Sequence, residues 1–248
     1  MIIFITGATS GFGLAMTTRF LNHGHHVIAT GRRDKNLAEL KLKFSKNLHT
    51  IKLDIRNREE VKKAIAHLPE VFKKIDVLIN NAGLALGVDA AQKASLDDWE
   101  VMVDTNINGI LNCTHYILPA MVERNFGHIV NLGSVAGEFP YPGGNVYGAT
   151  KAFAHQFTLN LKADLLGTNV RVTSIEPGMC QTEFSEVRFR GDKDKADSVY
   201  KGMTALSAED IAETIDWVIS RPAHININVI SLMPTQQAFG AFATSRNN

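Results

Sequence analysis

The sequence contains very little cysteine. Cys113 and Cys180 are the two cysteines among 248 residues, and neither belongs to a CxxC or a similar ligand spacing. Disulfide frameworks and zinc sites need paired or closely spaced cysteines. We therefore expect no disulfide framework and no metal site in this protein.

An excess of charge of one sign is also missing. The chain has 26 basic and 25 acidic residues and a formal net charge of +1, which gives no electrostatic reason to expect nucleic acid or a membrane surface as a partner. No apolar run has the length of a membrane span, and the apolar residues 1–5 are too few for the core of a signal peptide. These absences predict a cytoplasmic protein with neither of those partners.

Hydrophobic residues are abundant, at 45% of the chain, and occur in short runs that alternate with amphipathic stretches. Strand-like runs occupy residues 2–6, 26–30, 49–54, 76–80, 128–132, 170–175 and 228–233, and helical patterns occupy 12–23, 35–45, 58–67, 97–123, 147–166 and 208–220. Most of the strand-like runs are uniformly apolar, as in a parallel sheet that helices cover on both faces. The alternation predicts one doubly wound α/β domain over residues 1–248.

Residues 179–203 interrupt this alternation. The segment is polar, charged and weakly periodic, and it follows the strand-like run 170–175. Open α/β sheets bind ligands at the carboxyl ends of their strands, so the segment has two interpretations. It is either a substrate-binding lid over the site or an ordinary surface insertion.

A glycine-rich loop joins the first strand to the first helix. It reads Gly7-Ala8-Thr9-Ser10-Gly11-Phe12-Gly13, a G-x3-G-x-G spacing. Glycines let a backbone turn tightly and approach a pyrophosphate closely, and the N-terminus of the following helix attracts the anion. Tight turns alone also need glycine, but the position between strand and helix favours a dinucleotide phosphate site.

The second strand ends in Thr30-Gly31-Arg32-Arg33, without the acidic residue that holds the ribose 2′-hydroxyl in an NAD site. Guanidinium groups suit a 2′-phosphate, so Arg32 and Arg33 favour NADP. The alternative is that both arginines are solvated surface charges. Asp34, the nearest acidic residue, is expected to cap the helix 35–45.

Tyr147 and Lys151 are four residues apart in a predicted helix, which places both on one face. The ordinary pKa of a phenol is too high for a base near neutral pH. Lys151 and the positive nicotinamide of an oxidised cofactor are expected to lower the pKa of Tyr147, which makes Tyr147 the candidate acid/base. An ordinary helix surface pair is the alternative.

These residues occur together with others in a recognisable order. The loop TGATSGFG, NNAG at 80–83, Asn106, Ser134, the Tyr147-x-x-x-Lys151 pair and Pro177-Gly178 resemble the short-chain dehydrogenase/reductase superfamily. The resemblance implies a single Rossmann-type domain with strand order 3-2-1-4-5-6-7. It also implies a homotetramer built through the helices 97–123 and 147–166.

The resemblance further implies roles for individual residues. Ser134 would bind the substrate oxygen, and Asn106 would hold a local helix distortion and a water that relays protons from Lys151. Lys151 is also expected to donate to the ribose hydroxyls of the nicotinamide half. The remaining cofactor contacts would come from Asp54 and Ile55 at the adenine, Asn81 and Gly83 at the ribose, and Pro177, Gly178 and Thr182 at the nicotinamide.

Further segments are similar to bacterial NADP-dependent 3-hydroxy acid dehydrogenases: GLALG at 83–87, QKASLDDWE at 92–100 and EFSEVRFRGD at 183–192. That similarity implies oxidation of L-serine, L-allo-threonine and 3-hydroxypropionate and reduction of malonic semialdehyde, with no metal. Met179–Thr182 is shorter than the corresponding loop of that group. Arg188 and Arg190 are candidates to clamp the substrate carboxylate.

Two other functions remain open at this point. A 3-ketoacyl-carrier-protein reductase or a broad carbonyl reductase would use the same scaffold and the same catalytic residues. A non-catalytic NADP-binding sensor would keep the fold, but such proteins typically lack the tyrosine or the lysine, and this chain has Tyr147 and Lys151.

Overall fold

Parallel strands form the centre of the molecule, in a seven-stranded sheet with the order β3-β2-β1-β4-β5-β6-β7. This computed structural model describes residues 1–240 and 244, so residues 241–243 and 245–248 of the expected domain lie outside the described residues. The strands are β1 Ile2–Ile5, β2 His26–Gly31, β3 Leu48–Lys52, β4 Val77–Asn80, β5 Gly127–Leu132, β6 Val170–Pro177 and β7 Val229–Leu232. The strand order and the single-domain Rossmann-type fold are confirmed.

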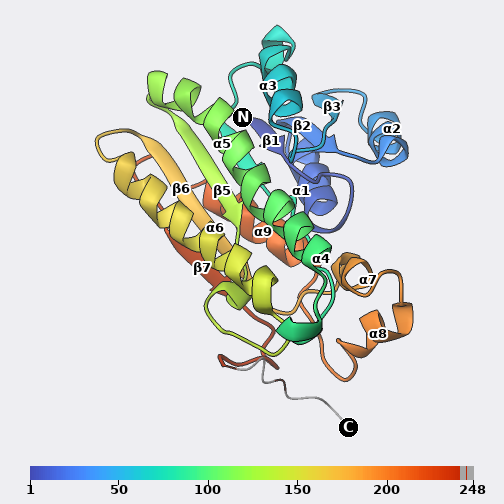
Figure 1. Cartoon of the computed structure of the whole chain (residues 1–248). Coiled ribbons are helices and arrows are strands. Elements are labelled where there is room, and N and C mark those ends of the chain that lie inside the picture. Colours follow the sequence, from blue (N-terminus) through green and yellow to red (C-terminus); the bar gives the residue numbers. More distant parts are fainter. Residues whose placement is uncertain (241–243, 245–248) are drawn as a thin grey trace.

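The helices cover both faces of this sheet (Figure 1). They are α1 Gly11–Asn22, α2 Asp34–Lys43, α3 Arg58–Ala66, α4 Leu96–Val103, α5 Gly109–Glu123, α6 Asn145–Asp164, α7 Phe184–Arg188, α8 Lys193–Ser198 and α9 Ala208–Ile219. A π-helical segment, Asp104–Asn108, joins α4 to α5, and short 3₁₀ turns occupy Glu70–Phe72, Ala91–Lys93 and Val135–Gly137. Within the described residues, no helix combines the length and the apolar character that crossing a bilayer requires.

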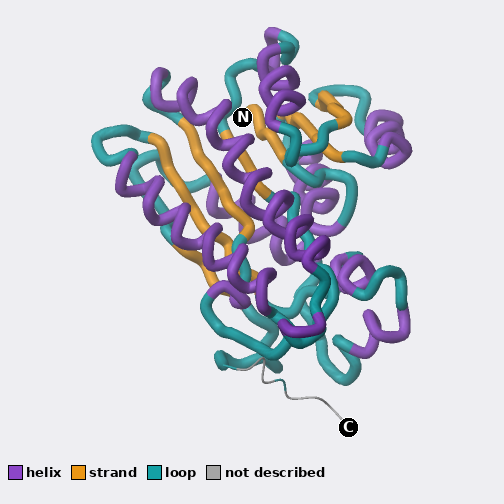
Figure 2. The backbone as a smooth tube through the Cα atoms, viewed as in Figure 1, coloured by secondary structure: helices purple, strands orange, loops and turns teal. Residues whose placement is uncertain are grey.

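Two apolar cores lie on opposite faces of the sheet. On one face α1 and α9 pack together, through residues such as Phe20 and Ile215. On the other face α3, α5 and α6 contribute Val61, Ile117 and Leu161. Every residue of β4, β5 and β6 is buried, as expected for parallel strands covered on both sides. Figure 2 shows the strands enclosed between these helices.

The predicted helix 97–123 is not one regular α-helix. Its middle is the π-helical segment Asp104–Asn108, and Asn106 lies within it. The Asn106 amide donates to the Leu84 carbonyl at 2.8 Å and to Thr150 Oγ1 at 3.0 Å, and its oxygen accepts from the Leu84 N–H at 2.9 Å. The expected distortion at Asn106 is therefore present, and it ties this helix to α6 and to the loop after β4.

The polar segment 179–203 contains two helices, α7 and α8, which are too short and polar to produce a periodic pattern. One expectation about local structure was wrong. Asp34 does not cap α2: Arg33 is the N-cap residue, and Asp34 is the first residue of the helix. The Asp34 carboxylate instead accepts a hydrogen bond from Lys52 Nζ at 2.6 Å, which holds it toward β3.

Candidate active site

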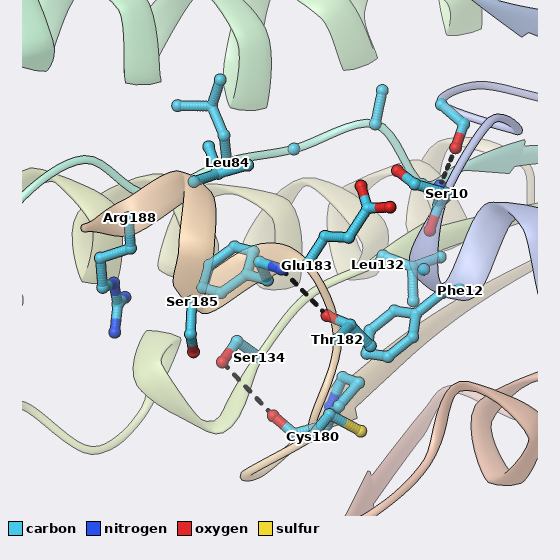
Figure 3. Close-up of a pocket in the computed structure, with 18 of the residues that line it drawn as sticks. Ser10, Phe12, Leu84, Leu132, Ser134, Cys180, Thr182, Glu183, Ser185 and Arg188 are labelled. Carbon is cyan, nitrogen blue, oxygen red and sulfur yellow. Dashed lines mark hydrogen bonds between the residues drawn. The ribbon is translucent and has the colours of Figure 1, made fainter. Parts of the chain in front are cut away.

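A cavity of about 710 Å³ opens at the carboxyl ends of the strands. Its walls come from the glycine loop, the ends of β2 to β6, the start of α6 and the segment 179–203. The predicted site residues that line it are Gly7, Thr9, Ser10, Gly11, Phe12, Arg32, Arg33, Asp54, Ile55, Asn81, Gly83, Ser134, Tyr147, Lys151, Pro177, Gly178, Thr182 and Arg188. Figure 3 shows Ser10 and Phe12 on one side of the cavity and Ser134, Ser185 and Arg188 on the other.

Four predicted residues lie outside the described lining: Ala8, Gly13, Asn106 and Arg190. Ala8 is fully buried, and its N–H donates to the Thr30 carbonyl at 2.8 Å. Gly13 is buried in the first turn of α1. Asn106 is buried as well. Arg190 forms an ion pair with Asp98.

The glycine loop has the shape of an anion cradle. Gly7 and Gly11 adopt φ values of +66° and +47°, which side-chain-bearing residues rarely adopt. A Cβ on Gly13 would collide with the Gly7 carbonyl oxygen. The Asn81 amide holds the loop in place by donating to the carbonyls of Thr6 at 2.8 Å and Gly7 at 3.2 Å. Gly7 and Gly11 line the cavity and have no side chains, and a pyrophosphate site needs such a close approach of the backbone.

Two arginines line the cavity beside this loop. Arg33 Nε donates to Thr9 Oγ1 at 3.4 Å, and Arg33 Nη1 pairs with Glu183 at 3.0 Å. Arg32 is exposed and also lines the cavity. Nearby, the Asp54 carboxylate is bound by the Arg56 guanidinium at 3.0 and 2.6 Å. This hydrogen bonding is the main reason that the pKa of Asp54 lies below its ordinary value.

Tyr147, Lys151 and Ser134 come together at the other side of the cavity. Lys151 Nζ donates to the Leu132 carbonyl at 2.7 Å and lies 5.9 Å from the Tyr147 ring centroid. Burial lowers the pKa of Lys151 to about 8. Ser134 Oγ accepts from the Ala136 N–H at 3.1 Å and donates to the Pro177 carbonyl at 3.4 Å, so this serine is both a cap residue and part of the cavity wall.

The electrostatic surroundings of Tyr147 differ from the expectation. Burial raises the pKa of Tyr147 to about 12, and the positive charge of Arg188 is the largest opposing influence, ahead of a hydrogen bond from Ser134. Lys151 was expected to lower this pKa, but its ammonium is directed to the Leu132 carbonyl. In the protein alone, desolvation of the phenolate therefore outweighs every neighbouring cation.

Arg188 and Arg190 have different surroundings although they are two residues apart. Arg188 Nη2 donates to the Tyr141 hydroxyl at 2.8 Å, and its guanidinium lines the cavity. Arg190 has a φ of +55° and forms an ion pair with Asp98 at 2.6 Å, with its side chain 68% exposed. Of the two candidates for a carboxylate clamp, the structure brings Arg188 to Tyr147 and leaves Arg190 on the surface.

Several lining residues were not anticipated from the sequence. They surround Arg188 and are Tyr141, Phe184, Ser185 and Tyr200. The ion pair between Arg56 and Asp54 was not anticipated either. Ser185 Oγ and the Tyr200 hydroxyl are 2.7 Å apart, and that hydroxyl donates to the Cys180 carbonyl at 2.7 Å. The one available signal was the concentration of aromatic residues within and before a polar segment.

Metal binding finds no support in the residue arrangement. Across residues 1–240 and 244, no group of three or more His, Cys, Asp or Glu side chains has the geometry to hold a metal ion. Both cysteines are buried and unpaired with each other.

Comparison with known proteins identifies the family. The family described as short chain dehydrogenase matches residues 1–193. This chain belongs to the short chain dehydrogenase family. In this member of the family, Ser134, Tyr147 and Lys151 lie at the carboxyl edge of the sheet.

Individual members of the short chain dehydrogenase family match over the whole chain. The NADP-dependent 3-hydroxy acid dehydrogenase of Salmonella typhi is 54% identical over 248 residues and covers 100% of both chains. The serine 3-dehydrogenase of Rhizobium radiobacter is 53% identical, over 99% of this chain and 98% of its own. A solved structure, the closed form of serine dehydrogenase complexed with NADP⁺, has a TM-score of 0.96 at 54% identity and covers 100% of both chains.

Proposed function

We propose that this protein is an NADP-dependent oxidoreductase that oxidises small 3-hydroxy acids at the hydroxyl and reduces the matching 3-oxo acids. L-Serine, L-allo-threonine and 3-hydroxypropionate, with malonic semialdehyde in the reverse direction, are the proposed substrates. Family membership and the names of its relatives support a hydroxy acid dehydrogenase that uses NADP. The observation that carries the proposal is the Arg188 guanidinium in the same cavity as Ser134 and Tyr147.

Different residues around the cavity suit different parts of NADP. The glycine loop would hold the pyrophosphate, and Arg32 and Arg33 would hold the 2′-phosphate. The other proposed cofactor contacts are residues that line the cavity: Gly7, Thr9, Ser10, Gly11, Phe12, Asp54, Ile55, Asn81, Gly83, Pro177, Gly178 and Thr182. Ala8 and Gly13, which are buried in the loop, would support these contacts. When bound, NADP⁺ would supply the hydride acceptor for the carbinol carbon in the oxidative direction.

The protein's own residues would then handle the proton. Tyr147 takes the proton of the substrate hydroxyl, and Ser134 holds the same oxygen in place. Lys151 would donate to the ribose hydroxyls of the nicotinamide half. Asn106, which is hydrogen-bonded to Thr150 at the base of α6, would hold the water through which the proton leaves Lys151.

Initial rates of nicotinamide absorbance change test this function. NADP and NAD would each be tested with L-serine, L-allo-threonine and 3-hydroxypropionate, and NADPH with malonic semialdehyde. We expect turnover with NADP and 3-hydroxy acids. Turnover of acetoacetyl thioesters or plain ketones instead would favour a 3-ketoacyl-carrier-protein reductase or a broad carbonyl reductase. No turnover of any of these, combined with tight NADP binding, would favour a sensor.

The two arginines at the 2′-phosphate site should determine cofactor choice. Replacing both Arg32 and Arg33 with alanine should weaken NADP binding by roughly tenfold or more, because charge-assisted hydrogen bonds to the phosphate are lost. Binding of NAD, which has no 2′-phosphate, should change little. Fluorescence titration with NADPH and NADH measures both constants. Equal losses for both cofactors would mean that these arginines support the fold of the loop rather than phosphate recognition.

The substrate carboxylate should bind Arg188. Replacing Arg188 with methionine should raise KM for 3-hydroxypropionate by roughly tenfold, whereas KM for propane-1,3-diol, which has no carboxylate, should stay nearly constant. Arg190→Met is the matched control, because it removes the same charge from the same segment without altering the cavity wall. If Arg188→Met raised KM equally for both substrates, Arg188 would not be the ligand of the substrate carboxylate.

We also propose that residues 179–203 form a lid over the substrate. They supply Thr182, Phe184, Arg188 and Tyr200 to the cavity wall, and Figure 1 shows α7 and α8 together beyond the sheet, next to α4. The proposal extends to a homotetramer through α4–α5 and α6, located in the cytoplasm.

A further inference from the structure

The Arg188 guanidinium lies against the ring of Tyr147. Its central carbon is 5.0 Å from the Tyr147 ring centroid, 5.2 Å from that of Phe184 and 5.8 Å from that of Tyr141. Its Nη2 is fixed by the hydrogen bond to the Tyr141 hydroxyl. Its Nε is buried and has no hydrogen-bond partner among the described residues. The cation is therefore held in one place and is poorly solvated on the side that faces the aromatic rings.

Lys151 is a second cation close to this ring, and it lies farther from the ring centroid than Arg188 does. Its ammonium lies 5.9 Å from the Tyr147 ring centroid and is directed to the Leu132 carbonyl at 2.7 Å. An opposite charge within about 4–6 Å favours the charged form of a titratable group. Measured to the ring centroid, Arg188 lies closer to the Tyr147 side chain than Lys151 does.

We propose that Arg188 is a positioning residue for proton transfer as well as a carboxylate ligand: it stabilises the Tyr147 phenolate, so that closing the lid prepares Tyr147 to accept a proton. This inference rests on the proposed function because it takes Tyr147 as the acid/base. In the oxidative direction, the substrate hydroxyl gives its proton to the Tyr147 phenolate oxygen. In the reductive direction, the Tyr147 hydroxyl returns this proton to the substrate oxygen.

The titratable groups that face Tyr147 are consistent with this role. Burial raises the pKa of Tyr147, and Tyr141 and Tyr200 add to the increase, whereas Arg188 and the hydrogen bond from Ser134 lower it. Lys151 on α6 faces the ring as well. Met102 of α4 and Ala85 of the loop after β4 pack in the same cluster and are not titratable. Arg188 is the strongest of the influences that favour the phenolate.

The position of Arg188 depends on the lid. The Arg188 carbonyl accepts from the Gly87 N–H at 3.0 Å, which ties the end of α7 to the loop after β4. At the other end of α7, Glu183 pairs with Arg33. Because Arg188 is the last residue of α7, movement of this helix away from the cavity would remove the cation from Tyr147. Proton transfer would then be coupled to lid closure.

The pH dependence of kcat in the oxidative direction tests the inference, with propane-1,3-diol as substrate so that no carboxylate occupies Arg188. Tyr147 must be deprotonated to act as a base, so kcat falls as the pH falls through the apparent pKa of this group. Removing a stabilising cation raises that pKa. Arg188→Met should therefore move the acidic limb upward by about 1–3 pH units, and Arg188→Lys, which keeps the charge, should restore most of the shift.

Arg190→Met is the control and should leave the limb at the wild-type pH. The inference would be overturned if the acidic limb of the kcat profile moved equally in Arg188→Met and Arg190→Met, or if it moved in neither variant. If KM for 3-hydroxypropionate rises in Arg188→Met while the limb stays fixed, the carboxylate clamp stands and the inference falls. If the limb moves in Arg188→Met while KM for 3-hydroxypropionate stays constant, the inference is supported and Arg188 is not the carboxylate ligand.

A second readout requires no turnover. The chain has four tyrosines, so the tyrosinate absorbance of wild-type protein minus that of Tyr147→Phe isolates the ionisation of Tyr147. In the NADP⁺ complex this difference signal should appear at higher pH in the Arg188→Met background than in wild type. An identical titration in both backgrounds would refute the inference even if the proposed substrate proved wrong.

Discussion

Tyr147→Phe should lower kcat by about 10²–10⁴-fold, the range that general acid–base groups contribute, while leaving NADPH affinity almost unchanged. The substitution removes the hydroxyl and keeps the ring, so the packing against Phe184 at 5.6 Å between centroids is preserved. Initial rates with NADP and 3-hydroxypropionate give kcat, and fluorescence titration gives the NADPH dissociation constant.

Tyr116→Phe is the matched control for this substitution. Tyr116 lies on α5, outside the described cavity lining, where its ring packs edge-on against His115. It should keep wild-type kcat. An unchanged rate in Tyr147→Phe would show that another group transfers the proton, and the proposed roles of Ser134 and Lys151 would need to be reassigned with it.

Gly13→Ala should weaken NADPH binding by roughly 10- to 100-fold. A Cβ at this position would meet the Gly7 carbonyl oxygen and the Asn81 amide nitrogen, the latter at 2.7 Å, so the glycine loop has to shift. Overpacking of this kind costs about 1–3 kcal/mol, which corresponds to the stated range of affinity. Fluorescence titration measures the constant, and thermal unfolding reports any loss of stability.

Gly24→Ala provides the comparison. Gly24 has a φ of +79°, and a Cβ there would contact nothing within 4 Å. Its cost of about 1–2 kcal/mol comes from backbone strain alone, so it should lower the melting temperature without changing NADPH affinity. If the two variants bind NADPH equally well, the close approach at Gly13 has no part in cofactor binding.

The sequence was sufficient to predict the sheet, and most of the candidate residues that it indicated line one cavity. The central strands are uniformly apolar because helices cover both of their faces. This pattern can be recognised in the sequence without knowledge of the contacts. Glycine spacing and the Tyr147–Lys151 pair predicted which residues would meet at one edge of the sheet. These features are local, so the chain itself displays them.

Other features depend on contacts that no local pattern displays. Arg188 and Arg190 look equivalent in the sequence, and they differ because α7 ends between them and Arg190 turns toward Asp98. The direction of the pKa shift of Tyr147 was also unpredictable, since it reflects how completely the fold removes water from that ring. The short helices α7 and α8 have too few residues for a periodic signal.

The π-helical segment between α4 and α5 makes the orientation of α5 depend on the number of residues that precede it. Its wider turns add a residue to the helical register, and the buried positions Met102, Asn106 and Ile110 follow at steps of four. Each residue of an α-helix corresponds to a rotation of about 100°. A chain with one residue fewer between 104 and 108 would present a different side of α5 to the sheet, so the phase of the whole helix depends on the number of residues in this turn.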